Sequence, residues 1–263
     1  MDLGLKDKVA VVAGASRGLG YAVAAMLGQE GAKLVINSRS RAHLDSASER
    51  LASQGIVEVL AIEGDIASPS VPADIVAKTI KRFGKLDIVI SNSGGPPPGA
   101  FEGFSDEDWQ KAIDLCLMSH VRLIRAALPD LKQSLDASIL TITSYSVKQP
   151  IPNLILSNSI RAATVGLTKS LALELGHDGI RVNSILPGWT ETERVQDLMA
   201  FKAQTNHTTI EEEIRKQAME SPLGRLAQPD EFARVAAFLV SPAASYLTGV
   251  MLSVDGGMVK GML

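Results

Sequence analysis

Apolar and polar residues follow two alternating patterns along most of the chain. Short runs rich in valine and isoleucine, typical of strands buried on both faces, are each followed by a longer stretch with apolar residues at helical spacing. The strand-like runs are 9–12, 33–37, 57–62, 86–90, 138–143, 180–186 and 250–254. This alternation predicts an α/β fold, with a doubly wound, mostly parallel sheet of about seven strands and helices on both faces.

The helical stretches are marked by apolar spacing and by glycines that end them. The first follows a glycine-rich turn, and the others are 41–53, 71–83, 106–131, 155–175 and 229–240. Four of these helices are followed by a glycine, which can adopt a left-handed backbone without strain. These glycines are Gly31, Gly55, Gly84 and Gly176.

The turn after the first strand has the features of an anion-binding site. The run 9–12 leads into Gly14, Gly18 and Gly20, and a helical pattern follows at once. Backbone N–H groups in such a turn, together with the positive end of the helix dipole, favour a pyrophosphate. A strand, a glycine turn and a helix in one βαβ unit predict a Rossmann fold that binds a dinucleotide.

We expect residues 1–263 to form a single dinucleotide-binding and catalytic domain. The Pro- and Gly-rich segment 91–99 breaks regular structure, but the same alternation continues after it, which favours a loop over a linker. The polar helical stretch 189–221, with a capping box from Thr209 to Glu212, is expected to be a substrate lid within this domain.

The composition argues against several function classes. A net charge of −3 and an aromatic fraction of 4% provide neither a basic surface nor stacking residues for nucleic acid. Cys116 is the sole cysteine, so neither an intrachain disulfide nor a multi-cysteine metal site is expected. No apolar run reaches ~18 residues, and residues 1–6 do not resemble a secretion signal. We expect a cytoplasmic enzyme that binds no metal, nucleic acid or membrane.

Segments that follow successive strands resemble short-chain dehydrogenases/reductases. The spacing of Gly14, Gly18 and Gly20 is similar to that family's cofactor turn, and 92–95 is similar to its Asn-Ala-Gly-Gly segment. Asp65, the segment 187–192 and the C-terminal 254–257 match further family positions in the same order. The resemblance covers nearly the whole chain and implies a nicotinamide dinucleotide bound by Gly14, Ser16, Arg17, Gly18, Leu19, Gly20, Ser38, Arg39, Asp65, Ile66, Asn92, Ser93, Gly94, Arg161, Pro187, Gly188 and Thr192.

The charges near the second strand favour NADP(H) over NAD(H). NAD-binding proteins need a carboxylate at the end of this strand for the ribose 2′-hydroxyl, and the sequence here is Asn37-Ser38-Arg39. Arg39 supplies a planar cation suited to a 2′-phosphate, and Arg17 resembles the basic residue of NADP-preferring members.

The residues for the chemical step depart from the family pattern. The family uses a serine, a tyrosine, a lysine four residues after the tyrosine, and an asparagine in the preceding long helix. Ser144 matches the serine, but the other positions hold Ser157, Arg161 and Cys116. A serine hydroxyl is a poor general acid near neutral pH, whereas Arg161 keeps the positive charge.

Nearby residues are candidates to replace the missing acid. Tyr145 follows Ser144 directly, and Lys148 lies in the next turn; each is either a proton donor or an ordinary loop residue. His120 lies four residues after Cys116, on the same helix face, where a packed histidine is favoured over a relay. Cys116 itself fits a small buried residue.

Three functions follow from these residues. The first is reduction of a ketone, of 3-oxoacyl or other type, by an NADP(H)-dependent enzyme with a non-standard proton donor; the chain resembles an atypical subgroup described as acyl-carrier-protein ketoreductase-like. The second is a catalytically silent nucleotide-binding or scaffold protein. The third is C=C reduction, since dienoyl-CoA reductases similarly place serine at the position of Ser157 and a tyrosine soon after the fifth strand. The resemblance also implies a small-molecule or acyl-thioester substrate and a homotetramer or homodimer.

Overall fold

A computed structural model describes residues 2–262, and within them the strands form one parallel sheet with helices on both faces. The strand order is β3-β2-β1-β4-β5-β6-β7. The strands are β1 (Val9–Val12), β2 (Lys33–Ser38), β3 (Val59–Glu63), β4 (Ile88–Ser91), β5 (Ser138–Ile142), β6 (Arg181–Pro187) and β7 (Met251–Val254). The predicted fold class is confirmed. The order reverses between β1 and β4, and ligands of such sheets bind beyond the strand ends at this point.

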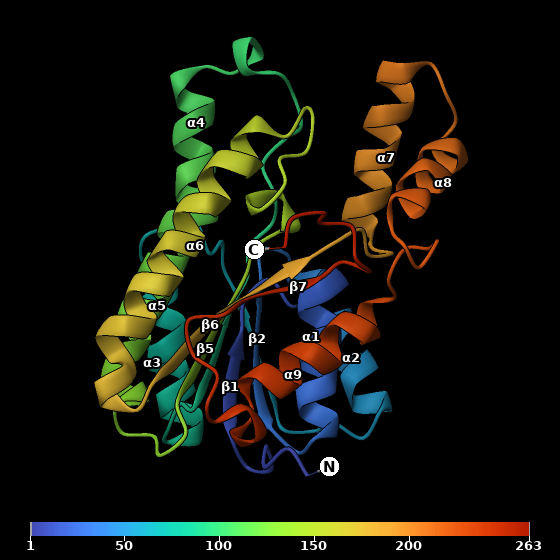
Figure 1. Cartoon of the computed structure of the whole chain (residues 1–263). Coiled ribbons are helices and arrows are strands. Elements are labelled where there is room, and N and C mark those ends of the chain that lie inside the picture. Colours follow the sequence, from blue (N-terminus) through green and yellow to red (C-terminus); the bar gives the residue numbers. More distant parts are fainter. Residues whose placement is uncertain (1, 263) are drawn as a thin grey trace.

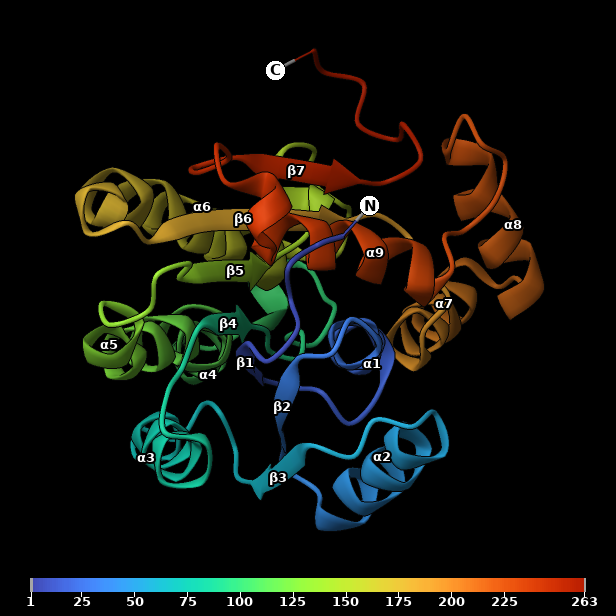
Figure 2. The same ribbon diagram turned by 90° about the horizontal axis from the view of Figure 1, so that it is seen from below.

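Helices cover the sheet in two layers (Figure 2). One layer holds α1 (Gly18–Gln29), α2 (Arg41–Ser53) and α9 (Pro229–Val240). The other holds α3 (Val71–Phe83), α4 (Asp106–Ile113), α5 (Ser119–Leu131) and α6 (Ile155–Leu175). Above the carboxyl ends of the strands, α7 (Glu193–Asn206) and α8 (Ile210–Glu220) stand opposite α4 and the N-terminal part of α6 (Figure 1).

Alternate residues of the central strand β1 enter two separate cores. Ala10 and Val12 belong to the cluster that packs against α1 and α9, while Val11 packs with residues of α3 and α5. All three side chains are fully buried, and burial of a valine contributes about 1.5–3 kcal/mol. Burial on both faces explains why the strands are continuous apolar runs rather than alternating ones.

The glycines that follow four predicted helices differ in backbone conformation. Gly31, Gly55 and Gly84 all have a positive φ at the end of a helix. Gly176 follows α6, which ends at Leu175 as predicted, but its φ of −58° is helical. A further 3₁₀ turn, Gly176–Asp178, continues the chain, and the left-handed residue is Gly179, with a φ of +74°.

The predicted long helix 106–131 contains a π-helical turn. This turn, Asp114–Met118, lies between α4 and α5. The hydroxyl of Thr164, on α6, donates a 2.5 Å hydrogen bond to the carbonyl of Cys116. That bond satisfies a carbonyl that the wider turn displaces, and it fixes Cys116 against α6.

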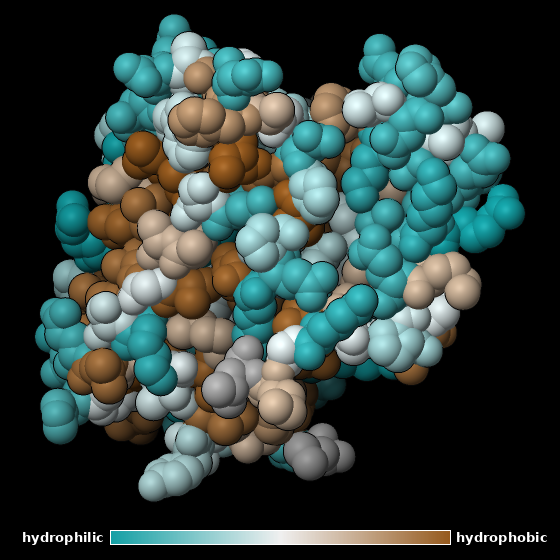
Figure 3. Space-filling model, turned by 45° about the horizontal axis from the view of Figure 1, so that its top comes forward, coloured by the Kyte–Doolittle hydropathy of each residue, from teal (hydrophilic) through white to brown (hydrophobic). Residues whose placement is uncertain are grey.

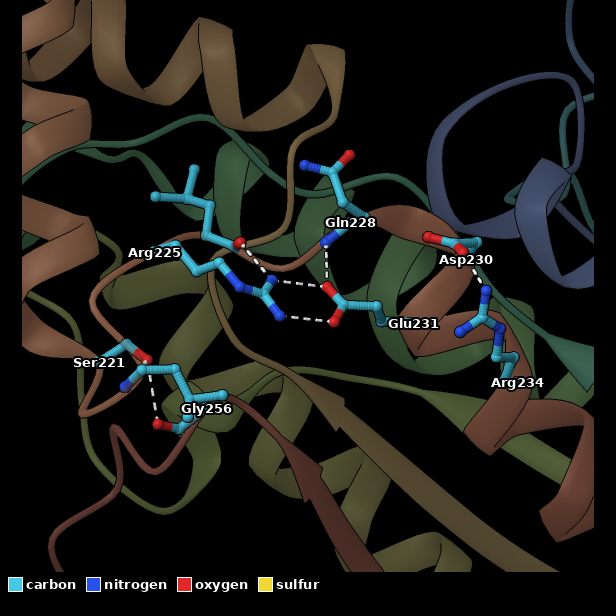
Figure 4. A network of polar contacts seen from close by, with 9 residues as sticks. Ser221, Arg225, Gln228, Asp230, Glu231, Arg234 and Gly256 are labelled. Carbon is cyan, nitrogen blue, oxygen red and sulfur yellow. Dashed lines mark hydrogen bonds and ion pairs between the residues drawn. The ribbon is translucent and has the colours of Figure 1, made fainter.

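The connection from α8 to α9 is held by polar contacts (Figure 4). Arg225 forms a bidentate ion pair with Glu231, both distances being 2.7 Å. Glu231 also accepts a bond from the backbone N–H of Gln228, and Ser221 donates to the carbonyl of Gly256 at 3.0 Å. Arg225 and the Gln228 N–H lower the pKa of Glu231 to about 2. These contacts fix the base of α8 relative to the sheet.

The outer surface of the molecule differs from side to side. Polar residues cover α7 and α8, whereas apolar residues gather on the side of α4 and α6 (Figure 3). Leu173, on α6, exposes 72% of its surface. None of the helices among residues 2–262 has the length and apolar content to cross a membrane.

Candidate active site

A cavity of about 660 Å³ lies at the carboxyl ends of the strands. Its walls come from the turns after β1, β4, β5 and β6, and from the first turns of α7. Every residue for which the family resemblance implies cofactor binding lines this one cavity. The sequence positions therefore converge, as the topology requires.

The glycine turn at the start of α1 forms one end of the cavity. Gly14 and Gly18 have φ values of +60° and +57°. A Cβ on Gly20 would lie 2.2 Å from the carbonyl oxygen of Gly14, so only glycine fits there. The side chain of Asn92 donates to the carbonyls of Ala13 and Gly14 at 3.2 and 3.3 Å. The turn is thus a rigid cradle made of backbone.

The end of β2 presents a cation and no acid. The Asn37 side chain is buried and donates to the carbonyls of Ile62 and Gly64, both at 3.0 Å. Arg39 is exposed at the edge of the cavity. Ser38, beside it, accepts a 2.9 Å bond from the Ser16 hydroxyl. Of the three residues 37–39 at the end of β2, Arg39 therefore carries the charge that a ligand in the cavity would meet.

Arg17 is paired across the cavity. Its guanidinium forms an ion pair with Glu193, at the start of α7. Both side chains are more than half exposed, so the pair is worth about 1 kcal/mol or less. A phosphate at Arg17 would compete with Glu193 for the same cation.

The segment after β6 closes the cavity from the other side. A Cβ on Gly188 would lie 2.6 Å from the Cα of Asp255, so the backbone passes close to the C-terminal turn. Thr192 caps α7 by accepting a 3.4 Å bond from the N–H of Val195. The positive end of α7 therefore faces the cavity.

Backbone carbonyls hold Arg161 at the end of the cavity that the turns after β4 and β5 form, here termed the reaction end. It exposes only 7% of its surface. Nη1 donates to the carbonyls of Ile142 and Thr143, both at 3.3 Å, and Nη2 donates to Gly94 at 2.9 Å. Ser157 lies one helical turn before it and also lines the cavity. The predicted shared face of Ser157 and Arg161 is present.

Ser144 and Tyr145 line the same end of the cavity. The Ser144 hydroxyl accepts a 3.1 Å bond from the N–H of Ser146. Tyr145 is 4% exposed and packs edge-on against Trp189, with ring centroids 6.1 Å apart. Burial, and to a lesser extent the charge of Glu220, raises the pKa of Tyr145 well above its usual value.

Three other candidates lie outside this arrangement. Lys148 is exposed and does not line the cavity. His120 is fully buried and its Nδ1 lies 2.7 Å from the Ser91 hydroxyl. Burial, with the nearby charge of Arg161, lowers the pKa of His120 to about 3, so the ring is neutral. Cys116 is buried, as predicted, with its sulfur 3.7 Å from the Gly94 carbonyl.

Arg194 is a cavity residue that the sequence reasoning missed. It lies in the polar stretch 189–221 and follows Thr192 by only two residues, so its place in the sequence is the one signal for it. Its Nη2 donates a 2.7 Å bond to the carbonyl of Pro96. Burial and the charge of Arg161 lower the pKa of Arg194, but a guanidinium keeps its proton.

Comparisons with known proteins agree with this geometry. The family model described as enoyl-(acyl carrier protein) reductase matches residues 14–259. Dehydrogenase/reductase SDR family member 4 of Caenorhabditis elegans is 34% identical, over 96% of this chain and 95% of the relative. The NADPH-dependent reductase BacG of Bacillus subtilis (strain 168) is 30% identical, over 97% and 99%.

Two solved structures have the same fold throughout. An L-sorbose reductase from Gluconobacter frateurii, complexed with NADPH and L-sorbose, gives a TM-score of 0.94 at 33% identity, with all of both chains covered. An actinorhodin polyketide ketoreductase with NADPH gives 0.93 at 29% identity, covering 97% of this chain and 98% of the other.

Proposed function

The chain belongs to the short-chain dehydrogenase/reductase family, and from this premise we propose that it reduces a ketone, of 3-oxoacyl or other type, without the family's tyrosine. It is an NADP(H)-dependent oxidoreductase of the short-chain type that acts on carbonyl compounds. The observation that carries the proposal is Arg161, a buried cation beside Ser144 in a cavity with a dinucleotide cradle.

The residues of the cradle fit NADP(H). The pyrophosphate would lie on the turn from Gly14 to Gly20, which lines the cavity at the start of α1. Arg39, with Ser38, would hold the 2′-phosphate, and Asp65 with Ile66 would contact the adenine end. The nicotinamide end would lie between the segments 92–94 and 187–192, with Arg161 at its ribose. When bound, NADPH supplies the hydride for the carbonyl carbon.

Arg161 and Ser144 would stabilise the negative charge that develops on the carbonyl oxygen. Three backbone carbonyls hold the guanidinium in place before substrate arrives, so little reorganisation is needed. Ser144 would donate a hydrogen bond to the same oxygen. Ser157 lies one helical turn before Arg161, on the same face of α6. The carbonyl oxygen would take a proton from solvent, which balances the hydride delivered to the carbon and gives an alcohol. An alkoxide is basic enough to accept that proton from water.

Tyr145 and Lys148 are less suited to the role of proton donor. The raised pKa of Tyr145 means that the phenol holds its proton tightly, and the family's lysine, which lowers a tyrosine pKa, is absent. Tyr145 would instead form a cavity wall with Trp189. Lys148 faces solvent, outside the cavity.

The test is NADPH oxidation over a panel of ketones, enones and dienoyl thioesters, with product analysis. We expect alcohol as the product with at least one ketone, and a loss of kcat of about 10²–10³ in Ser144→Ala, because an oxyanion donor is removed. Ser170→Ala, on the exposed face of α6, is the matched control.

Two other outcomes would identify the alternatives. Saturation of a substrate C=C bond, without alcohol formation, would indicate the dienoyl-type reaction. The adjacency of Ser144 and Tyr145 favours that reaction. NADPH binding without turnover over the whole panel would indicate a silent nucleotide-binding protein, which the changes at Ser157, Arg161 and Cys116 favour.

The segment 189–221 and the apolar side of the molecule complete the proposal. We assign α7 and α8, with Trp189 before them, as the substrate lid, because Trp189 and the start of α7 line the cavity and α8 packs against α7 on a fixed base. The apolar side chains on the side of α4 and α6 support a homotetramer or homodimer formed through the long helices.

A further inference from the structure

The reaction end of the cavity contains two arginines, Arg161 and Arg194, and no ion pair to either among residues 2–262. Arg161 is almost fully buried, and Arg194 is largely buried on the first turn of α7. All their hydrogen bonds within the described chain go to backbone carbonyls. Burial of a charge without a counter-ion costs desolvation free energy, so two such cations at one site are unusual in a folded protein.

Both guanidiniums hold the same loop. Arg161 donates to the carbonyl of Gly94, and Arg194 donates to the carbonyl of Pro96, two residues later. The residue between them is Gly95, where a Cβ would lie 2.9 Å from Nη2 of Arg194. Arg194 therefore lies directly against this loop, and the charge of Arg161 contributes, after burial, to lowering the pKa of Arg194.

Arg194 keeps most of its donors free. A guanidinium has five N–H groups, and Arg194 uses one of them, on Pro96. The nearest acids do not neutralise it: Asp197, one turn along α7, forms no ion pair with it in the described structure, and Glu193 pairs with Arg17. A planar fork of free donors matches a carboxylate, which it can bind with two parallel hydrogen bonds.

The position of this fork distinguishes it from the cofactor's phosphate sites. The glycine turn follows β1, and Arg39 follows β2, on one side of the point where the strand order reverses. Arg194 contacts the loop after β4, near Ser144 and Arg161, on the other side. An anion at Arg194 would thus lie at the substrate end.

We propose that the substrate is an oxo acid, and that Arg194 binds its carboxylate while Arg161 faces its carbonyl oxygen. This inference rests on the proposed function and names its substrate class. A neutral ketone would leave the Arg194 charge uncompensated, whereas an oxo acid satisfies both arginines at once. Arg194 is accordingly a specificity residue near the start of the lid segment 189–221.

The test measures binding rather than turnover. The full-length protein, saturated with NADP⁺, is titrated by calorimetry with 2-oxobutanoate, 3-oxobutanoate and 4-oxopentanoate, and with the amide of each. We expect at least one acid to bind about tenfold to hundredfold more tightly than its amide, as expected for a charge-assisted bond. Arg194→Met should remove that difference and leave the Kd of NADPH within about twofold.

Arg125→Met is the matched control, since Arg125 is exposed on α5, lies outside the cavity and carries the same charge. Equal binding of all acids and amides would overturn the inference. It would also be overturned by an equal loss in Arg125→Met, or by a parallel loss of NADPH affinity in Arg194→Met, which would assign Arg194 to the cofactor. Acid binding without any NADPH oxidation would contradict the proposed reaction and leave the carboxylate site standing, so the two failures differ.

Discussion

The two ends of the cavity are built in different ways. The cofactor end consists mainly of backbone, with Gly14 and Gly18 at positive φ and Gly20 in contact with the Gly14 carbonyl. The reaction end consists of side chains, chiefly Ser144, Ser157, Arg161 and Arg194. A cradle of backbone tolerates few substitutions, because an added Cβ collides with the main chain. A wall of side chains can change its chemistry without disturbing the fold.

This difference explains why family membership defines the cofactor more firmly than the reaction. At the position of Ser157 either a serine or a tyrosine can be carried by α6, since the side chain faces the cavity. Arg161 even adds contacts of its own to three carbonyls. The same scaffold can therefore carry a different way of stabilising an oxyanion, as we propose for Arg161 and Ser144.

The largest expected effect is at the cofactor end, in Gly20→Ala. The new methyl group would lie 2.2 Å from the Gly14 carbonyl oxygen, so the turn must shift. We expect the Kd of NADPH, measured by fluorescence titration, to rise more than about 100-fold, because the N–H groups no longer converge. Gly166→Ala, in α6 with no atom near its Cβ position, is the control. Normal affinity in Gly20→Ala would show that the pyrophosphate lies elsewhere.

Arg161→Met tests whether the reaction end is also structural. The change leaves the carbonyls of Thr143 and Gly94 without their donor in a buried site. We expect the free energy of unfolding to fall by about 2–4 kcal/mol in urea titrations. Arg161→Lys keeps the charge and should recover part of the loss. Unchanged stability in Arg161→Met would mean that the arginine serves the ligand alone.

Arg39→Met tests the preference for the phosphorylated cofactor. The loss of a cation at the 2′-phosphate should raise the Kd of NADPH by about tenfold to hundredfold and leave that of NADH unchanged. Arg41→Met is the matched control, because Arg41 pairs with Asp45 and lies outside the cavity. An equal effect on NADH, or an equal effect of Arg41→Met, would remove Arg39 from the 2′-phosphate site.

Much of the fold could be predicted because the determining signals are local. The buried strands are short apolar runs, three helix ends coincide with left-handed glycines, and the capping box from Thr209 to Glu212 forms as expected. The cavity positions follow from the topology, since the turns after parallel strands meet at one edge of the sheet.

The missed features depend on distant contacts. The π turn at Cys116 accompanies a hydrogen bond from Thr164, 48 residues away. Arg194 reaches the carbonyl of Pro96 across 98 residues of sequence, and neither residue predicts the other. Gly176 has the sequence signal of a helix end, but one more turn fits before Gly179. Such choices are decided by packing between elements, which a single sequence does not display.

The smallest effect is expected in Tyr145→Phe, which sharpens the contrast within the reaction end. If Arg161 stabilises the oxyanion and solvent supplies the proton, removal of the Tyr145 hydroxyl should change kcat less than about fivefold, with Lys148→Ala giving no change. A kcat lower by about 10² or more in Tyr145→Phe would instead make Tyr145 the proton donor.

A pH titration of stability separates the packing role of Tyr145 from an acid role. Because burial raises the pKa of the folded Tyr145 above its ordinary 10.0, folding favours the neutral phenol. Its contribution to stability is therefore full below pH 10 and declines as the pH rises beyond 10, where the unfolded tyrosine ionises and the folded one does not. Wild type should lose stability relative to Tyr145→Phe only in that alkaline range. A relative gain of stability between pH 6 and 9 would mean that the folded phenol ionises near neutrality, and Tyr145 would then be suited to act as the acid.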